Sequence, residues 1–272
     1  MDRRNWMQVA AAGTIGCGCF SGCKTAPITG RKQLMLIPEQ NEVAMGSQAF
    51  AEALETEAAA TSPRYQEMVS RVAQRIARAS GRSDYEWEAR CVASPEKNAY
   101  ALPGGKIVIY EGILPVCQNE AGLAVVMSHE VAHVLARHGG ERMSQQAAVN
   151  GVKTAVGYAM RNKEQVSKDL WMKAYGMATN YGLVLPYSRK HESEADHIGV
   201  MLMSDAGYDP TEAPKFWKRF AAAGSGPKQP EFLSTHPSDD RRASDLERLL
   251  PDALEAYRNT ADQIVVGQPI LA

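Results

Sequence analysis

His129, Glu130 and His133 form a short motif whose spacing suits metal-assisted hydrolysis. On a helix, positions i and i+4 lie on one face, so both imidazoles can reach a single metal ion. Glu130 directly follows the first histidine and places a carboxylate beside that ion, where it can accept a proton from water. A chain of 272 residues with 6 His and 31 acidic residues would contain about 0.015 such strings by chance. The stretch therefore predicts a helix built for hydrolytic chemistry.

Two histidines are too few for a catalytic zinc ion, which usually takes three protein ligands and leaves a fourth position to water. The best candidate for the third ligand is Glu192, in the charged segment 189–196. Asp196 follows one helical turn later on the same face, where it could accept the second ring N–H of a ligating histidine. We predict that Glu192 binds the metal and that Asp196 orients a ligand. A charged, solvated helix face is the alternative for this segment.

Four other polar residues lie near these candidates in the sequence without sharing their faces. Glu194, His191 and His197 fall on different sides of the helix that carries Glu192 and Asp196. His138 lies five residues beyond His133 and is expected to project elsewhere. We expect His191 and His197 to be surface or structural histidines.

The helix that carries the histidine motif is expected to run from Asn119, a good N-cap, to Arg137, with Gly139 and Gly140 as its stop. Apolar residues occur on nearly all of its sides, which predicts a buried helix whose histidines need partners other than water. Further helices are expected over residues 39–60, 62–81, 188–207, 209–223 and up to residue 250.

Two strands are expected before this helix. Tyr85 to Cys91 alternates apolar and charged residues, and Lys106 to Tyr110 is a second strand. Between them, Asn98 to Gly105 contains Pro103 and paired glycines, which suits a sheet edge and a tight turn. Such an edge could pair with an extended peptide, and an ordinary hairpin turn is the alternative. The elements together predict a mainly helical α+β fold with a small antiparallel sheet.

Composition predicts one main domain, over residues 39–272. The chain is 44% hydrophobic, which is enough for one core, and its formal net charge is -1. Lysine and arginine are scattered among the acidic residues, so a nucleic-acid partner is disfavoured.

The first residues predict an export signal over residues 1–23, followed by a tether over residues 24–38. Arg3 and Arg4 precede an apolar run that ends in Phe20-Ser21-Gly22-Cys23. Small residues before a cysteine resemble the lipobox of bacterial lipoproteins, which would make Cys23 the lipid-bearing first residue of the mature protein. Plain secretion and an uncleaved membrane tether are the alternatives.

Processing at Cys23 would leave Cys91 and Cys117 as the remaining thiols. An exported protein could join them in a disulfide. Two small buried hydrophobic residues are the alternative, and neither cysteine has the spacing of a zinc ligand.

These motifs together resemble a family of zinc metallopeptidases. The family includes the CaaX prenyl proteases, HtpX, the mitochondrial Oma-type proteases and the bacterial BepA/LoiP-like envelope proteases. The resemblance is strongest from about Asn98 to Arg242, and it extends more weakly to Thr29-Gly30-Arg31. The chain has no long hydrophobic spans, which is similar to the lipid-anchored envelope branch. The matching residues are His129-Glu130-Val131-Ala132-His133, Glu192-Ser193-Glu194-Ala195-Asp196, His236-Pro237 and Arg242.

The resemblance implies a zincin-like fold with one Zn²⁺ per chain. His129, His133 and Glu192 would be the zinc ligands and Glu130 the general base. Asp196 would lie beside the ligands, where it is sometimes described as a proton donor. In relatives, a histidine placed like His236 either stabilises the oxyanion of the reaction or occupies the fourth zinc position and blocks water. Arg242 would lie near the same site.

The implied function is a zinc-dependent endopeptidase of the bacterial cell envelope that acts in protein quality control on extended, unfolded or misassembled polypeptides. An N-terminal lipid on Cys23 would hold it on the periplasmic side of a membrane, and Lys24 after that cysteine favours the outer membrane. A non-catalytic or autoinhibited zinc-bound lipoprotein that binds peptides like a chaperone is the alternative. The physiological substrate and the oligomeric state do not follow from the sequence.

Overall fold

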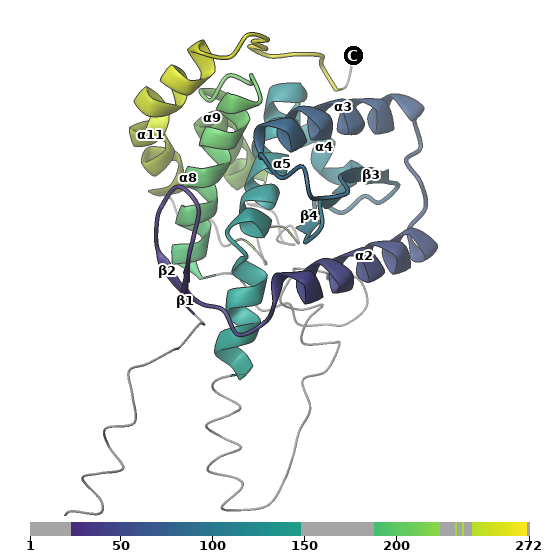
Figure 1. The fold of residues 1–272 in the computed structure, drawn as a ribbon. Coiled ribbons are helices and arrows are strands. Elements are labelled where there is room, and N and C mark those ends of the chain that lie inside the picture. Colours follow the sequence, from purple (N-terminus) through teal and green to yellow (C-terminus); the bar gives the residue numbers. More distant parts are fainter. Residues whose placement is uncertain (1–22, 148–187, 224–231, 233–235, 237–240, 271–272) are drawn as a thin grey trace, which may run out of the picture.

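A three-stranded sheet and the helix α5 form the centre of the structure (Figure 1). The computed structural model describes residues 23–147, 188–223, 232, 236 and 241–270. Among these residues, no helix combines the length and the apolar character needed to cross a bilayer. The elements are β1 (Cys23–Thr25), β2 (Lys32–Leu34), α2 (Glu39–Thr56), α3 (Pro63–Ala79), β3 (Glu88–Val92), β4 (Ala99–Leu102), β5 (Lys106–Tyr110), a 3₁₀ turn (Glu111–Ile113), α4 (Leu114–Cys117), α5 (Glu120–Leu135), α8 (Arg189–Asp205), α9 (Glu212–Ala223) and α11 (Arg241–Arg258).

The main sheet has the strand order β3-β5-β4 and is mixed. Strands β4 and β5 form an antiparallel hairpin, as expected from the paired glycines between them. Strand β3 lies on the other side of β5 and runs parallel to it. The mainly helical α+β fold is therefore confirmed, while the sheet is antiparallel only in part. Strand β4 pairs with one edge of β5 as its hairpin partner. Strand β3 therefore pairs with the other edge of β5, and there it runs in the same direction as β5.

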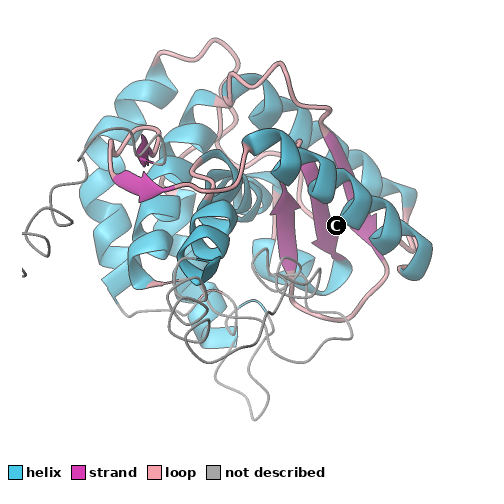
Figure 2. Cartoon of the chain, turned by 60° about the horizontal axis from the view of Figure 1, so that its bottom comes forward, coloured by secondary structure: helices cyan, strands magenta, loops and turns pink. Residues whose placement is uncertain are grey.

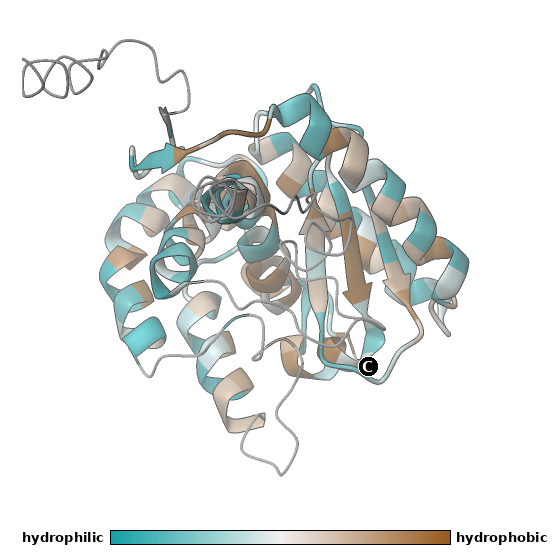
Figure 3. Ribbon diagram, turned by 90° about the horizontal axis from the view of Figure 1, so that it is seen from below, coloured by the Kyte–Doolittle hydropathy of each residue, from teal (hydrophilic) through white to brown (hydrophobic). Residues whose placement is uncertain are grey.

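The central strand β5 is buried on both faces because its side chains alternate between two hydrophobic clusters. Ile107 and Ile109 pack in the cluster that contains residues of α3 and α5. Val108 and Tyr110 pack in a second cluster with Phe50 of α2. Figure 3 shows the hydrophobic colour along the strands. Helix α5 therefore packs against one face of the sheet.

Helix α5 is buried from Glu120 to Val134, as its apolar composition predicted. The side chain of Asn119 caps it by accepting a 2.9 Å hydrogen bond from the amide of Gly122. The predicted stop at Gly139 and Gly140 is wrong. The helix ends at Leu135, Arg137 takes a positive φ of 53°, and helical structure resumes over residues 138–147. The break comes earlier than the glycines and changes the direction in which the following side chains point.

Helix α8 packs closely against α5, and Gly199 permits this approach. A Cβ atom at Gly199 would lie 3.2 Å from both the Cα and the amide nitrogen of His129. Ser188 begins the helix by accepting a hydrogen bond from the amide of His191, as predicted. The close packing brings the carboxylates of α8 within reach of the histidines of α5.

Residues 24–38, expected as a tether, contain more structure than a spacer needs. Strands β1 and β2 form an antiparallel hairpin, which Figure 2 shows apart from the main sheet. Ala26, Gln33 and Met35 are buried. The side-chain amide of Gln33 donates a 2.5 Å hydrogen bond to the carbonyl of Ala136, at the break after α5. The hairpin is therefore packed onto the domain. Of the signal predicted over residues 1–23, residues 1–22 lie outside the described residues.

Cys91 and Cys117 are free thiols in the structure, and both are buried. Burial raises the pKa of Cys91 to about 12, so it stays a protonated thiol at neutral pH. The two cysteines act as small hydrophobic residues of the core, and the disulfide alternative is not what the structure shows.

Candidate metal centre

Four ligand atoms from three parts of the chain converge at the centre of the domain. His129 and His133 come from α5, Glu192 comes from the first turn of α8, and His236 lies between α9 and α11. All four residues are at least 97% buried. Their ligand atoms lie within 4.8 Å of one another, and they form the one such group among the described residues.

The spacing of these atoms fits a tetrahedral zinc ion. Nε2 of His129 lies 3.1 Å from Nε2 of His133 and 3.3 Å from Nδ1 of His236. Oε1 of Glu192 lies 3.1 Å from Nδ1 of His236 and 3.5 Å from Nε2 of His133. A tetrahedron around zinc, with bonds near 2.0–2.1 Å, has edges of about 3.3 Å. Lone pairs that converge in this way repel one another unless a cation lies between them, so the cluster is able to bind a metal.

Asp196 lies beside His129, at the position the sequence predicted. Its Oδ1 is 3.0 Å from Nδ1 of His129. Arg242 donates to both oxygens of Asp196, at 2.7 and 2.6 Å, and its guanidinium lies 3.5 Å above the ring of Trp217. Burial would raise the pKa of Asp196, but the charge of Arg242 and the hydrogen bond from His129 lower it. The carboxylate is therefore charged and can fix the tautomer of His129.

Glu130 follows His129 on α5 and lies against the ring of His236. Its Oε1 is 3.4 Å from Nε2 of His236 and is buried without a hydrogen-bond partner among the described residues. Burial raises the pKa of Glu130 to about 7, although the charge of His236 opposes the shift. A carboxylate with a pKa near neutrality is suited to accept and return a proton.

The motifs and their geometry agree with the comparison to known families. Residues 63–250 match the family model described as Peptidase family M48. The chain belongs to peptidase family M48. The resemblance inferred from the motifs is thereby confirmed, and with it the assignment as a zinc-using metalloendopeptidase.

Named relatives of this M48 protein are metalloendopeptidases and proteases. It is 38% identical over 266 residues to the mitochondrial metalloendopeptidase OMA1 of Schizosaccharomyces pombe, which covers 96% of this chain and 76% of that protein. The OMA1 of Saccharomyces cerevisiae is 38% identical over 182 residues, covering 64% of this chain and 50% of the relative. The beta-barrel assembly-enhancing protease of Yersinia pestis is 30% identical over 160 residues, covering 57% and 32%. The chain thus spans half or less of the last two relatives.

His236 takes the fourth corner of the M48 site in this structure. Its Nδ1 faces His129 and Glu192, and its ring stacks on Phe232 with a centroid distance of 4.5 Å. Its amide donates a 2.8 Å hydrogen bond to the carbonyl of Phe232. Nδ1 of His236 is therefore one of the four ligand atoms that converge in the cluster.

Three residues that sequence reasoning set aside lie in or beside the M48 site. His138, His191 and Glu194 are buried, and His138 contacts His133 directly. The expectation for His138 assumed an unbroken helix, in which five residues rotate a side chain by about 140°. The break at residues 136–137 removes that rotation. His197 is half-buried.

Glu194 does point away from Glu192, as its position two residues later predicts. That side of α8 is covered by the N-terminal hairpin, so the carboxylate is buried instead of solvated. The resemblance at Thr29-Gly30-Arg31 was the one sequence signal that could have indicated this cover.

Proposed function

We propose that this M48 protein hydrolyses extended or unfolded polypeptides, with Glu130 as the general base. His129, His133 and Glu192 hold the zinc ion in this proposal. The observation that carries it is the buried carboxylate of Glu130, which lies 3.4 Å from the ring of His236, one of the four residues whose ligand atoms converge.

The chemistry divides between the ion and the chain. Zinc, when bound, supplies a Lewis acid that polarises a carbonyl and makes water a stronger nucleophile. Glu130 accepts the proton of the attacking water and returns it to the leaving amide nitrogen. Asp196 accepts the Nδ1–H of His129, which leaves the Nε2 lone pair directed at the other ligand atoms.

The edge strand β4 is the proposed peptide-binding edge. The amide of Tyr110 donates to the carbonyl of Asn98, so the alternation of an antiparallel pair directs the N–H and C=O of Ala101 away from β5. An extended peptide could add a strand there. All four residues of β4 are buried in this structure, as is the fourth corner filled by His236. A peptide can therefore bind in this proposal only after the site opens.

The general-base role is tested with the substitution Glu130→Gln. The variant should bind zinc like the wild type, since Glu130 is not a ligand, and should lose cleavage of casein. His129→Ala should lose the zinc itself, which elemental analysis of the purified protein measures. Retained turnover by Glu130→Gln would contradict the mechanism.

His236 supports a second candidate function, in which the closed zinc site binds peptides without cutting them. Comparing wild type with His236→Ala separates the two. If His236 closes an active protease, its removal increases casein cleavage. If it stabilises the developing oxyanion, its removal lowers cleavage about 10²–10³-fold. No cleavage by either protein, with zinc bound in both, would favour the binding function.

The proposed location is the bacterial cell envelope, with a lipid on Cys23 and a role in protein quality control. The lipobox-like residues before Cys23 support the anchor, and the name of the beta-barrel assembly-enhancing relatives supports the envelope. The relatives named mitochondrial support a different compartment. Expression in a Gram-negative host with radiolabelled palmitate tests the anchor: wild type should be labelled and sediment with outer membranes, and Cys23→Ser should do neither. An unlabelled wild type would contradict it.

A further inference from the structure

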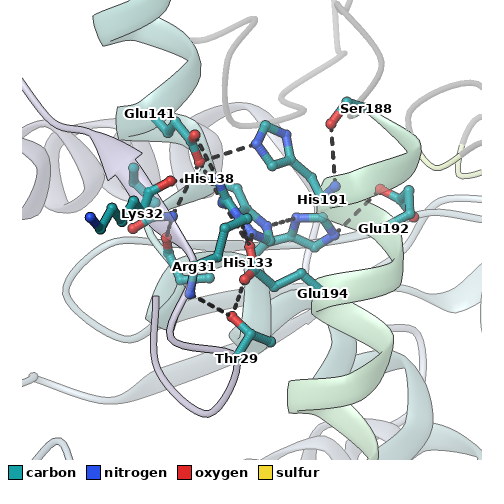
Figure 4. Close-up of polar contacts among 12 residues, drawn as sticks. Thr29, Arg31, Lys32, His133, His138, Glu141, Ser188, His191, Glu192 and Glu194 are labelled. Atoms are coloured by element: carbon teal, nitrogen blue, oxygen red, sulfur yellow. Dashed lines mark hydrogen bonds and ion pairs between the residues drawn. The ribbon is translucent and has the colours of Figure 1, made fainter. Parts of the chain in front are cut away.

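A line of buried polar contacts runs from the N-terminal hairpin to His133 (Figure 4). Nδ1 of His133 lies 2.9 Å from Nδ1 of His138. Nε2 of His138 lies 2.9 Å from Oε2 of Glu194, and the same oxygen accepts a 2.7 Å hydrogen bond from Nε of Arg31. The side chains of His138 and Glu194 are 0% and 4% exposed. Water therefore competes little for these contacts.

The direction of each hydrogen bond follows from the zinc-binding role of His133. A histidine that binds zinc through Nε2 carries its proton on Nδ1. His138 then accepts at its own Nδ1 and carries its proton on Nε2, which donates to Glu194. The chain of contacts thus defines one tautomer for each of the two rings.

Two hairpin residues hold Glu194 in its buried position. Thr29 donates to one carboxylate oxygen and Arg31 to the other. With His138, Glu194 therefore has three hydrogen-bond partners that replace water around its buried carboxylate. The remaining nitrogens of Arg31 donate to Glu141 at 2.8 and 2.6 Å. The guanidinium therefore bridges the carboxylates of Glu194 and Glu141. We call the contacts from Glu194 through His138 to His133 the relay, and Glu141 lies outside it.

We propose that Thr29 and Arg31 are positioning residues of the zinc site, which act on His133 through Glu194 and His138. The inference rests on the proposed role of His133 as a zinc ligand. A carboxylate that fixes the tautomer of a ligating histidine strengthens metal binding. The zinc site is accordingly complete only when the N-terminal hairpin is docked, and a segment more than 90 residues before the histidine motif sets its metal affinity.

The competing explanation is that Arg31 only fixes the hairpin to the domain through ion pairs. Glu141 and Glu194 separate the two explanations because both bind Arg31, at 2.6 and 2.7 Å, and Glu194 also lies 2.9 Å from Nε2 of His138. Glu141→Gln weakens hairpin docking and leaves the relay in place. Glu194→Gln weakens docking similarly and also removes the charge that fixes His138.

The experiment measures zinc affinity of full-length variants by competition with a chromogenic chelator, and thermal unfolding of the zinc-free proteins. Glu194→Gln should lower zinc affinity about 10–100-fold. Glu141→Gln should change zinc affinity far less, although the zinc-free forms of the two variants should have similar melting temperatures. The visible spectrum of the Co²⁺-substituted proteins provides a second readout, because it should change in Glu194→Gln and stay as in wild type in Glu141→Gln.

Two milder hairpin variants keep the test valid if Glu194→Gln unfolds. Thr29→Val removes one hydroxyl donor and keeps the side-chain shape, and Arg31→Lys keeps the charge and loses the fork. Both variants should lower zinc affinity. The loss in Arg31→Lys should be smaller than the loss in Arg31→Ala, which removes the charge as well. Equal zinc affinities for Glu141→Gln and Glu194→Gln, or unchanged affinity in both hairpin variants, would overturn the inference. If the proposed function itself were wrong, His133→Ala would also leave zinc affinity unchanged.

Discussion

The two histidines of α5 that we propose as zinc ligands are supported in different ways. His129 donates directly to Asp196, whose partner Arg242 comes from α11 and is stacked on Trp217. His133 reaches its carboxylate through a second imidazole, and the arginine that holds this carboxylate comes from the N-terminal hairpin. We call these the core arm and the hairpin arm.

The difference lies in what each arm requires of the fold. The core arm is built within the packed centre, since Arg242 is 6% exposed and lies among buried residues of α8, α9 and α11. The hairpin arm depends on a two-stranded element outside the main sheet, and the Arg31 side chain is 14% exposed. The elements that form the core arm should therefore separate only when the domain unfolds. The hairpin arm can be weakened by changes that leave the core intact.

The largest expected effect is the loss of Arg242. Arg242→Ala would leave Asp196 and Glu192 as buried carboxylates without their cation, because Arg242 contacts both, at 2.6 and 3.1 Å. Removing one partner of a buried ion pair typically costs about 3–5 kcal/mol. Urea unfolding of the zinc-free protein should show a loss of this size. The matched variant Arg31→Ala, in the hairpin arm, should lose distinctly less, and equal losses would remove the distinction between the arms.

The next effect is on zinc affinity without unfolding. Asp196→Asn keeps an oxygen that can accept from His129 but removes the charge that stabilises its tautomer. Zinc affinity should fall by about 10–100-fold. Because the carboxylate acts directly on a ligand, the loss should exceed that of Glu194→Gln, which acts through His138. Chelator competition measures both, and a larger loss in Glu194→Gln would reverse the order of the two arms.

The core arm could largely be predicted from the sequence, because its spacing survives in regular structure. The unbroken helix α5 carries both His129 and His133, and the unbroken helix α8 carries both Glu192 and Asp196. Within each helix, residues i and i+4 lie on the same face. His236 could not be placed by periodicity, since it lies between α9 and α11, and the resemblance to a family was what indicated it.

The hairpin arm could not be predicted, for two physical reasons. The left-handed conformation of Arg137 breaks the helix before His138, and nothing in the local sequence requires it there. The residue is held by tertiary contacts, including a 2.9 Å hydrogen bond from Arg137 to the carbonyl of Ile37 and an ion pair with Glu42. Likewise, Glu194 is buried by the hairpin, a contact across more than 160 residues of sequence. Periodicity predicts faces of single elements and gives no information on which distant segment covers them.

A third prediction concerns α8, which carries the carboxylates of both arms. Gly199→Ala would place a Cβ atom 3.2 Å from the backbone of His129, so the helices must separate slightly. Overpacking of this kind typically costs about 1–3 kcal/mol. Zinc affinity should fall modestly, because Asp196 and Glu194 both move with α8. Ala195, which is already an alanine on the same helix, shows that a methyl group is accepted one turn earlier. Unchanged stability and zinc affinity would show that neither arm depends on this close approach.

The smallest expected effect is the pH dependence of the hairpin arm. Burial would raise the pKa of Glu141, but hydrogen bonds from Arg31 and His191 hold it well below its ordinary value of 4.5. Because the folded pKa lies below the unfolded one, the Arg31–Glu141 pair contributes fully above about pH 4.5, and its contribution is lost as the pH falls further. Glu194, which also contacts Arg31, shifts in the same direction.

The measurement is the difference in melting temperature between the wild type and Arg31→Gln, both without zinc. The difference should be constant from pH 8 to pH 5, by the linkage that relates folded and unfolded pKa values, and should shrink between about pH 4.5 and pH 3. Lys218→Gln is the matched control, because the Lys218–Glu247 pair is exposed (64% and 50%) and should contribute little at any pH. A difference that grew on acidification would mean that the hairpin is held by contacts other than the buried carboxylates, and the hairpin arm would then lose its electrostatic basis.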